Sequence, residues 1–332
     1  MCEVASQRVF DYIISVSFSS APQGVVCAGV LVADLFIPPL ARLPMAGELM
    51  ATQDFLADSG GCAANTATAL VKLGVKATVA GQVGNDPFGD FILQDLQRKG
   101  VNTAGISRSS HHGTSKTVIL PVTGEDRRYL HTFGANADFA AEDIAPELIQ
   151  TTQVFCVGGY LILPSLKADV LSQLFQQARS HGARTVLDVV VPAGDQSAAK
   201  SALVEVLPHV DFFLPNDDEA ERLTGEMDPH RQAQQLLQLG CGNVVITLGE
   251  HGALLMNHNE TIEVPAFPVS IVDQSGAGDA FAAGLIVGLL EQLDLTRTLR
   301  FASIIGASAF TALGCNAGLF TRSQAEAFLA KS

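Results

Sequence analysis

A regular alternation of strand-like and helix-like segments over residues 153–248 limits the possible folds of this chain most strongly. Short apolar runs occur at 154–157, 185–189, 211–214 and 243–248. Longer segments with helical spacing lie between them, at 164–181, 198–207, 217–224 and 228–239. Strands that alternate with helices form βαβ units, whose right-handed crossovers make the strands parallel. The pattern therefore predicts an α/β fold built on a mostly parallel sheet.

Further elements are predicted on both sides of this alternation. We expect a first strand from Gly24 to Ala33 that ends in Asp34, and a helix that begins after Ser59 and stops at Gly74. The remaining predictions are a strand at 77–81, a helix that ends at Lys99, two short antiparallel edge strands at 253–256 and 261–264, and helices at 294–312 and 322–331.

Two segments, 36–58 and 114–134, do not fit the alternation. The first is extended and contains several prolines and a glycine, which argues against a helix. The second has two β-rich runs on either side of Thr123-Gly124-Glu125-Asp126, a hairpin signature. We expect both segments to form a small sheet that acts as a lid on one domain of residues 25–332, with residues 1–24 as an N-terminal extension.

Charge and cysteine usage narrow the class of protein. The 332 residues include 20 Lys and Arg against 34 Asp and Glu, a formal charge of −14, without a basic run. Nucleic acid and anionic membrane surfaces are therefore poor partners. The six cysteines are scattered without a CxxC pair, and no apolar run approaches the length of a membrane span. We expect a cytoplasmic protein with reduced cysteines.

The strongest chemical signal lies in residues 272–284. Gly276, Ala277 and Gly278 form a small-residue turn that opens an apolar helix. Such a turn directs several free N–H groups and the positive end of the helix dipole toward one point, a geometry that binds phosphate. Asp279 would repel phosphate there, but it suits a base that takes a proton from an attacking hydroxyl. The simpler alternative is a tight turn with an aspartate cap.

Seven motifs in one order extend this signal over most of the chain. They are Asp34, Gly60-Gly61-x-x-x-Asn65, residues 83–89 (Val-Gly-Asn-Asp-Pro-Phe-Gly), Gly134-Ala135-Asn136-Ala137, Asn216-x-x-Glu219, Thr247-x-Gly249-x-x-Gly252 and Asp273-x-x-Gly276-Ala277-Gly278-Asp279. Together they resemble the ribokinase-like (PfkB) family of carbohydrate kinases over nearly all of residues 25–320. The resemblance implies a three-layer α/β/α sandwich with a central mostly parallel sheet, a small β-sheet lid, and transfer of the γ-phosphate of ATP to a sugar hydroxyl, with a terminal CH₂OH as the expected acceptor.

The resemblance also implies where the sugar binds. Asp34 would accept hydrogen bonds from sugar hydroxyls, and Gly60, Gly61 and Asn65 would supply backbone and amide contacts. Without the resemblance, Asp34 is equally well explained as a turn former, and Asn65 as a buried residue near a helix start.

Nucleotide and metal sites follow from the same comparison of motifs. Asn216 would contact ATP, and Glu219 would hold Mg²⁺ through water, although both also suit simple helix capping. Thr247, Gly249 and Gly252 would border the nucleotide, although the same residues make an ordinary turn. Asp273 would lie beside a monovalent cation, so activation by K⁺ is a secondary hypothesis.

Several positions depart from the family pattern and leave the sugar open. Gln274-Ser275 replaces a hydroxyl pair, Ser303 stands where a nucleotide-facing Asn is common, and no Asn follows Asp188. No acid occurs at Gly159-Tyr160, where ribokinase itself has a glutamate for ribose. These changes leave the phosphoryl-transfer residues intact but weaken the case for ribose.

Two other functions remain open on sequence grounds. A nucleoside kinase of the same family would need an apolar slot for the base, for which Phe36, Phe55, Phe133 and Tyr160 are candidates. A non-catalytic sugar sensor is the other, but it would have no use for Asp279. Family members often dimerise through the lid, and the apolar run 117–122 would suit a homodimer.

Overall fold

The main body of the protein is organised around a nine-stranded sheet. The computed structural model describes residues 24–125 and 128–330, so the proposed N-terminal extension up to residue 23 lies outside the described residues. The strand order is β13-β12-β11-β10-β9-β8-β1-β4-β5. The strands are β1 (Gly24–Gly29), β4 (Lys76–Gly84), β5 (Asn102–Ser109), β8 (Val154–Gly158), β9 (Arg184–Asp188), β10 (Phe212–Leu214), β11 (Asn243–Thr247), β12 (Ala253–Asn257) and β13 (Thr261–Val264).

Seven of these strands run in parallel, and only the β11–β12 and β12–β13 pairs are antiparallel. The predicted antiparallel edge strands are therefore confirmed. Side chains alternate between two hydrophobic cores, since Val25 and Cys27 belong to one core and Val26 and Ala28 to the other. This alternation is the period of a strand that is buried on both faces.

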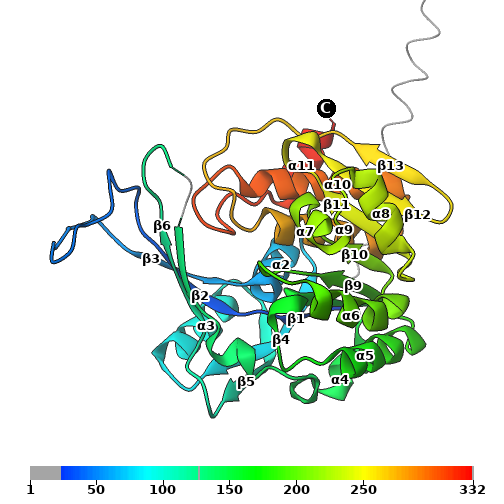
Figure 1. Ribbon diagram of the computed structural model, residues 1–332, viewed down its shortest axis with the longest axis horizontal. Coiled ribbons are helices and arrows are strands. Elements are labelled where there is room, and N and C mark those ends of the chain that lie inside the picture. Colours follow the sequence, from blue (N-terminus) through cyan, green and yellow to red (C-terminus); the bar gives the residue numbers. More distant parts are fainter. Residues whose placement is uncertain (1–23, 126–127, 331–332) are drawn as a thin grey trace, which may run out of the picture.

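Helices cover both faces of the sheet and complete three layers (Figure 1). The first core is closed by α2 (Cys62–Lys72), α3 (Pro87–Arg98), α9 (Ala277–Leu290), α10 (Leu295–Ala309) and α11 (Arg322–Leu329). The second is closed by α4 (Pro146–Thr151), α5 (Ala168–Ser180), α6 (Ser197–Val206), α7 (Asp217–Thr224) and α8 (Pro229–Leu237). No helix in residues 24–125 or 128–330 has both the length and the apolar character needed to cross a membrane.

A separate four-stranded sheet projects from the body, at the left of Figure 1. Its order is β3-β2-β6-β7, with strands β2 (Val32–Phe36), β3 (Leu56–Gly60), β6 (Lys116–Leu120) and β7 (Arg128–Thr132). The pairs β2–β3 and β6–β7 are antiparallel, whereas β2 and β6 are parallel. The hairpin predicted within 114–134 is therefore confirmed.

The prediction of one strand from Gly24 to Ala33 is wrong, because the chain leaves the main sheet between β1 and β2. Gly29 has φ +136°, and a Cβ there would lie 2.1 Å from the carbonyl oxygen of Gly158. Past this break, the carboxamide of Asn136 accepts from the N–H of Leu31 at 3.0 Å and donates to its carbonyl at 2.8 Å. The side chain of Asn136 thus supplies the backbone hydrogen bonds that Leu31 would make in a strand. Asp34 consequently lies in β2 of the small sheet and does not end a strand of the main sheet.

Two other expectations need correction. The segment between β2 and β3 forms no regular strand and has only one bridge, from Leu40 to Val122. The predicted lid strands within 36–58 are therefore limited to the end of β2 and the start of β3. The edge strand β5 was not predicted. Its sequence, Asn102–Ser109, lacks an apolar run, and its pairing with β4 supplies the order that local propensity does not.

Candidate active site

The polar residues after successive parallel strands meet at one edge of the main sheet. Asp188 ends β9, Asn216 follows β10, and Thr247 ends β11. Asn216 and Thr247 are bridge partners, and the N–H of Thr247 donates to the carbonyl of Pro215 at 3.3 Å. The carboxyl edge of a parallel sheet is where open α/β folds bind ligands. The sequence-predicted residues Asn216 and Thr247 are thus neighbours at this edge.

The predicted anion turn has the conformation that a glycine requires. Gly276 is the N-cap of α9, with φ +74°. A Cβ at Gly276 would also lie only 2.8 Å from the Cβ of Cys315. A Cβ at Gly278, by contrast, would meet no atom within 4 Å, so this side of the turn is open. The first N–H groups of α9, from Ala277 onward, have no partner within the helix. Together they form a site for an anion.

The carboxylate of Asp273 accepts hydrogen bonds at the start of this turn. Its Oδ1 accepts hydrogen bonds from the N–H of Ser275 at 3.1 Å and from the Ser275 hydroxyl at 3.0 Å. Its Oδ2 accepts from the N–H of Gly314 at 2.8 Å. The loop that carries Gly314 therefore lies beside Asp273 and presents an amide donor to its carboxylate.

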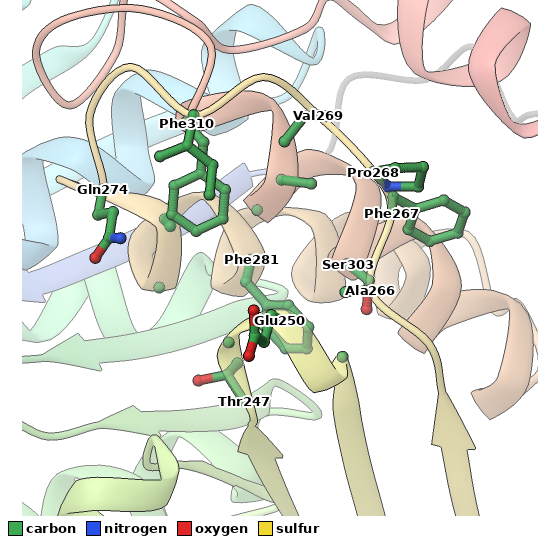
Figure 2. A pocket seen from close by; sticks show the side chains of 17 residues that line it. Thr247, Glu250, Ala266, Phe267, Pro268, Val269, Gln274, Phe281, Ser303 and Phe310 are labelled. Carbon is green, nitrogen blue, oxygen red and sulfur yellow. The ribbon is translucent and has the colours of Figure 1, made fainter.

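A pocket of about 580 Å³ opens in front of the turn (Figure 2). Thr247, Gly249 and Gly252 line it together with Ala277 and Gly278, which joins five of the predicted residues in one cavity. Figure 2 shows Thr247 and Glu250 on one side and Phe310, Val269 and Pro268 on the other. Asn216 and Asp279 are not among the lining residues. Apolar walls with few polar groups suit a flat heteroaromatic ligand such as a nucleobase.

Asp34 lies against Gly60 in the β2–β3 pair. A Cβ at Gly60 would lie 1.8 Å from Asp34 Oδ2, so only glycine permits this approach. Asp34 is buried, and burial raises the pKa of its carboxyl to about 7, while a hydrogen bond from Thr117 opposes the rise. Asp58 is paired directly with Asp34 across the ladder and forms an ion pair with Lys99. Two carboxylates thus lie where the sequence predicts the sugar, and one of them, Asp58, is paired with a cation.

Asn65 and Asp279 are 214 residues apart in the chain and form a hydrogen bond. Asn65 Nδ2 donates to Asp279 Oδ2 at 2.8 Å. Burial raises the pKa of Asp279 to about 6, and hydrogen bonds from Asn65 and Cys62 limit the rise. A carboxylate with a pKa just below neutral is ionised at pH 7 yet still able to accept a proton. The predicted base is therefore next to a predicted sugar-binding residue.

Comparison with known proteins accounts for this arrangement. The profile of the pfkB family of carbohydrate kinases matches residues 22–322. The chain belongs to this family. It is 29% identical over 288 residues to a ribokinase of Bacillus subtilis, covering 87% of this chain and 93% of the relative. It is 27% identical over 329 residues to fructokinase-2 of Oryza sativa, covering 95% and 96%.

The fold agrees with that of solved PfkB kinases. The structure of Arabidopsis thaliana ribokinase complexed with ribose and ATP superposes with a TM-score of 0.81 at 23% identity, covering 94% of this chain and all of that chain. The expected three-layer ribokinase-like fold with a small β-sheet lid is therefore confirmed. As a member of this family of carbohydrate kinases, the protein is an ATP-dependent phosphotransferase with a carbohydrate hydroxyl as acceptor. A putative ribokinase II from E. coli, which superposes with a TM-score of 0.78 at 22% identity, is solved in complex with ATP and Mg²⁺.

The acids of this PfkB site fit a divalent cation. Sγ of Cys62 and carboxylate oxygens of Asp188 and Asp279 all lie within 4.8 Å of one another. Burial first, then the charges of Asp279 and Glu219, hold the pKa of Asp188 well above its usual range. Burial also raises the pKa of Glu219 to about 7. Mg²⁺ prefers oxygen ligands, so the carboxylates suit it and the Cys62 thiol does not. A cation bound by the carboxylates would also offset their mutual repulsion.

The predicted partner of the metal, Glu219, is also a structural residue. Its Oε2 accepts from the N–H of Asn216 at 3.0 Å, and Asn216 Oδ1 accepts from the N–H of Glu219 at 2.8 Å. This reciprocal pair is a capping box at the start of α7. The helix-capping role considered from the sequence is therefore observed. The capping box also keeps Glu219 close enough to Asp188 for its charge to raise the pKa of the Asp188 carboxyl.

Sequence reasoning did not assign roles to several residues that the fold brings to the site. They are Asp58, Cys62, Lys99, Asp188 and Asn316. One of them, Asp188, had a usable signal, since it ends a buried strand of a parallel sheet. The others depend on contacts between distant segments.

The aromatic slot that a nucleoside kinase would need is not formed by the residues named for it. Tyr160 is buried in the core beneath α5 and α6, whereas Phe36 packs with Ile119 and Cys315. Phe55 and Phe133 are 57% and 49% exposed. The nucleoside hypothesis therefore loses the structural support proposed for it.

Proposed function

We propose that this kinase phosphorylates a hydroxyl of a neutral sugar, with a terminal CH₂OH as the acceptor and Asp279 as the base. The observation that carries the proposal is the hydrogen bond from Asn65 to Asp279 at 2.8 Å, because it joins the sugar side to the residue beside the anion turn. A non-catalytic sensor would need no such base.

Each predicted residue has one role in this scheme. Asp34 accepts hydrogen bonds from sugar hydroxyls, beside the backbone of Gly60 and Gly61, and Asn65 contributes its amide. Asp279 takes the proton of the hydroxyl as its oxygen attacks the γ-phosphorus, and the ADP oxygen leaves. The N–H groups of residues 276–278 stabilise the charge on the transferred phosphoryl group. Positioning and electrostatics supply the rate, without a covalent enzyme intermediate.

ATP lies in the pocket bordered by Thr247, Gly249 and Gly252, with its phosphates toward the turn and near Asn216. Mg²⁺ would be held by Glu219, through water, and by Asp188, and it neutralises phosphate charge when bound. K⁺ beside Asp273 is a secondary proposal. A rate that is equal in KCl, NaCl and LiCl would exclude it.

The charge of the site favours a neutral sugar over a sugar phosphate or a sugar acid. Asp34 and Asp58 face each other across β2 and β3, and Asp58 and Asp279 both raise the pKa of Asp34. Lys99, the cation that opposes them, is already paired with Asp58 and with Asp95, the latter at 2.7 Å. An anionic substrate would be repelled by these carboxylates, whereas the hydroxyls of a neutral sugar can donate to them.

The small sheet exposes several large apolar side chains. Leu56, Tyr129, Leu130 and Phe133 are 48%, 53%, 64% and 49% exposed, and all belong to this sheet or follow its last strand. We propose that two lids pair through these exposed side chains in a homodimer, and that the lid closes over the sugar to exclude water.

The test is ADP release from Mg·ATP across pentoses, hexoses, sugar acids, sugar phosphates and nucleosides. Turnover of a neutral sugar, together with a raised KM for that sugar and an unchanged KM for ATP in Asp34→Asn, would support the proposal. Preference for an anionic sugar or a nucleoside would contradict the substrate class. Sugar binding without any turnover would favour the sensor.

A further inference from the structure

We infer that Asn316 is a positioning residue for the base, because it fixes the orientation of the Asn65 carboxamide that donates to Asp279. The inference rests on the proposed role of Asp279. It adds a third residue, from the far end of the chain, that no motif of the sequence marks.

The three side chains form one directed row. Asn316 Nδ2 donates to Asn65 Oδ1 at 3.1 Å, and Asn65 Nδ2 donates to Asp279 Oδ2 at 2.8 Å. Asn65 and Asn316 are buried, with 5% and 8% of their surfaces exposed. Water therefore does not readily replace either bond.

The donors and acceptors permit only one orientation of Asn65. An ionised carboxylate only accepts, so Asp279 needs the NH₂ group of Asn65. If the Asn65 amide rotated by half a turn, its oxygen would face the carboxylate and its nitrogen would face the nitrogen of Asn316. Both contacts would then be repulsive. Asp279 thus requires this orientation of Asn65, and the donor of Asn316 reinforces it by holding the Asn65 oxygen in place.

The loop that carries Asn316 is held in place on both sides. The N–H of Gly314 donates to Asp273 at 2.8 Å, and Cys315 packs against Phe36 and Ile119 of the small sheet. These contacts hold the backbone next to Asn316 independently of its bond to Asn65.

Stability alone does not explain an amide at this position. Asn316 Oδ1 is buried and has no hydrogen-bond partner within the described part of the chain. An unpaired buried acceptor is a cost to folding. A smaller or apolar residue would avoid that cost, whereas only a donor at this position can orient Asn65.

Other ionisable groups also interact with Asp279, and a pH experiment has to use variants that leave those groups unchanged. Their electrostatic interactions with Asp279 come from several elements, namely Asp34 on β2, Asp188 on β9, Cys27 on β1, Cys62 on α2, Cys156 on β8 and Cys315. None of them contacts Asn316 through a hydrogen bond among the described residues. Substitution of Asn316 therefore changes the base through Asn65.

The experiment compares Asn316→Ala and Asn316→Asp with wild type in the full chain. The alanine removes the donor, and the aspartate places an acceptor against Asn65 Oδ1. We expect kcat to fall about tenfold in the alanine variant and further in the aspartate variant, with KM for ATP unchanged. We also expect the acid limb of the kcat/KM profile to move up by about one pH unit, since Asp279 loses the donor that lowers its pKa.

Asn257→Ala is the matched control, because it removes a similar amide pair, Asn257 Nδ2 to Asn243 Oδ1 at 3.0 Å, on β12 and β11. It should lower thermal stability without moving the pH profile. If both Asn316 variants keep the wild-type profile while Asp279→Asn is inactive, the positioning role is wrong and the base assignment stands. If Asp279→Asn keeps its rate, the proposed function itself fails. If one Asn316 variant does not fold, the other decides.

Discussion

Replacing Asp279 by asparagine should remove activity and at the same time stabilise the protein. Asparagine has nearly the same shape, and its oxygen can still accept from Asn65, but it cannot take a proton. Loss of a general base typically costs a factor of 10² to 10⁴, or about 3 to 5 kcal/mol in the activation barrier. We therefore expect less than about 1% of wild-type turnover.

The gain in stability follows from the cost of burying the charge. The pKa of Asp279 is raised from 3.8 to about 6, so the folded protein holds a proton that the unfolded chain releases in this range. The stability of wild type therefore falls as the pH rises from 3.8 to about 6, and the loss is complete above that. At about 1.4 kcal/mol per unit, the full shift corresponds to at most about 3 kcal/mol.

The melting temperature converts this free energy into a measurable shift. With about 2.1 cal/mol/K of unfolding entropy per residue, a chain of 332 residues has about 0.7 kcal/mol/K. The asparagine variant should then melt up to about 4 °C higher than wild type at pH 8, and at the same temperature as wild type near pH 4. Differential scanning calorimetry at both pH values, with ADP release as the activity assay, measures both effects.

Asp86→Asn is the matched control with the opposite sign. Asp86 accepts from Gly89 and from the N–H and hydroxyl of Thr114, and these bonds hold its pKa below the usual value. Its charge contributes stability that is present above pH 3.8 and lost at lower pH, so this variant should melt lower at pH 8. An Asp279→Asn protein with more than a tenth of wild-type turnover, or one that melts below wild type at pH 8, would refute the reasoning.

Three further predictions use the same site. The kcat/KM of wild type should rise with pH through about 6 and level off above 7, since Asp279 must be ionised to act, and a flat profile from pH 5 to 8 would contradict this. Gly276→Ala should lower the melting temperature and reduce turnover at least tenfold, because φ of residue 276 is +74° and the new Cβ would meet Cys315. Gly278→Ala, by contrast, should keep the wild-type stability and raise KM for ATP. Equal melting temperatures for the two variants would contradict this geometry. Leu130→Glu on the exposed strand β7 should give a monomer in sedimentation velocity, and an unchanged sedimentation coefficient would exclude an interface through the side chain of Leu130.

The sequence was sufficient for most elements and for the family. The alternation over residues 153–248 specified a parallel sheet because buried strands and amphipathic helices have different periods, which are local properties. The prediction made from the segment Gly276–Asp279 likewise rests on a local property of the chain. A glycine turn that opens a helix is a local geometry that can bind an anion. The acid beside it is also favourable as a helix cap, so it gained its catalytic interpretation from the other motifs.

Only the tertiary structure decided which distant residues share the site. The break between β1 and β2 depends on Gly158 and on Asn136, more than 100 residues away, so no local pattern around Gly29 could reveal it. Asn316 reaches Asn65, 251 residues earlier, through a row of hydrogen bonds that exists only after the sheet has formed. Periodicity and propensity describe neighbours along the chain, whereas the partners of a buried polar group are set by how the layers pack.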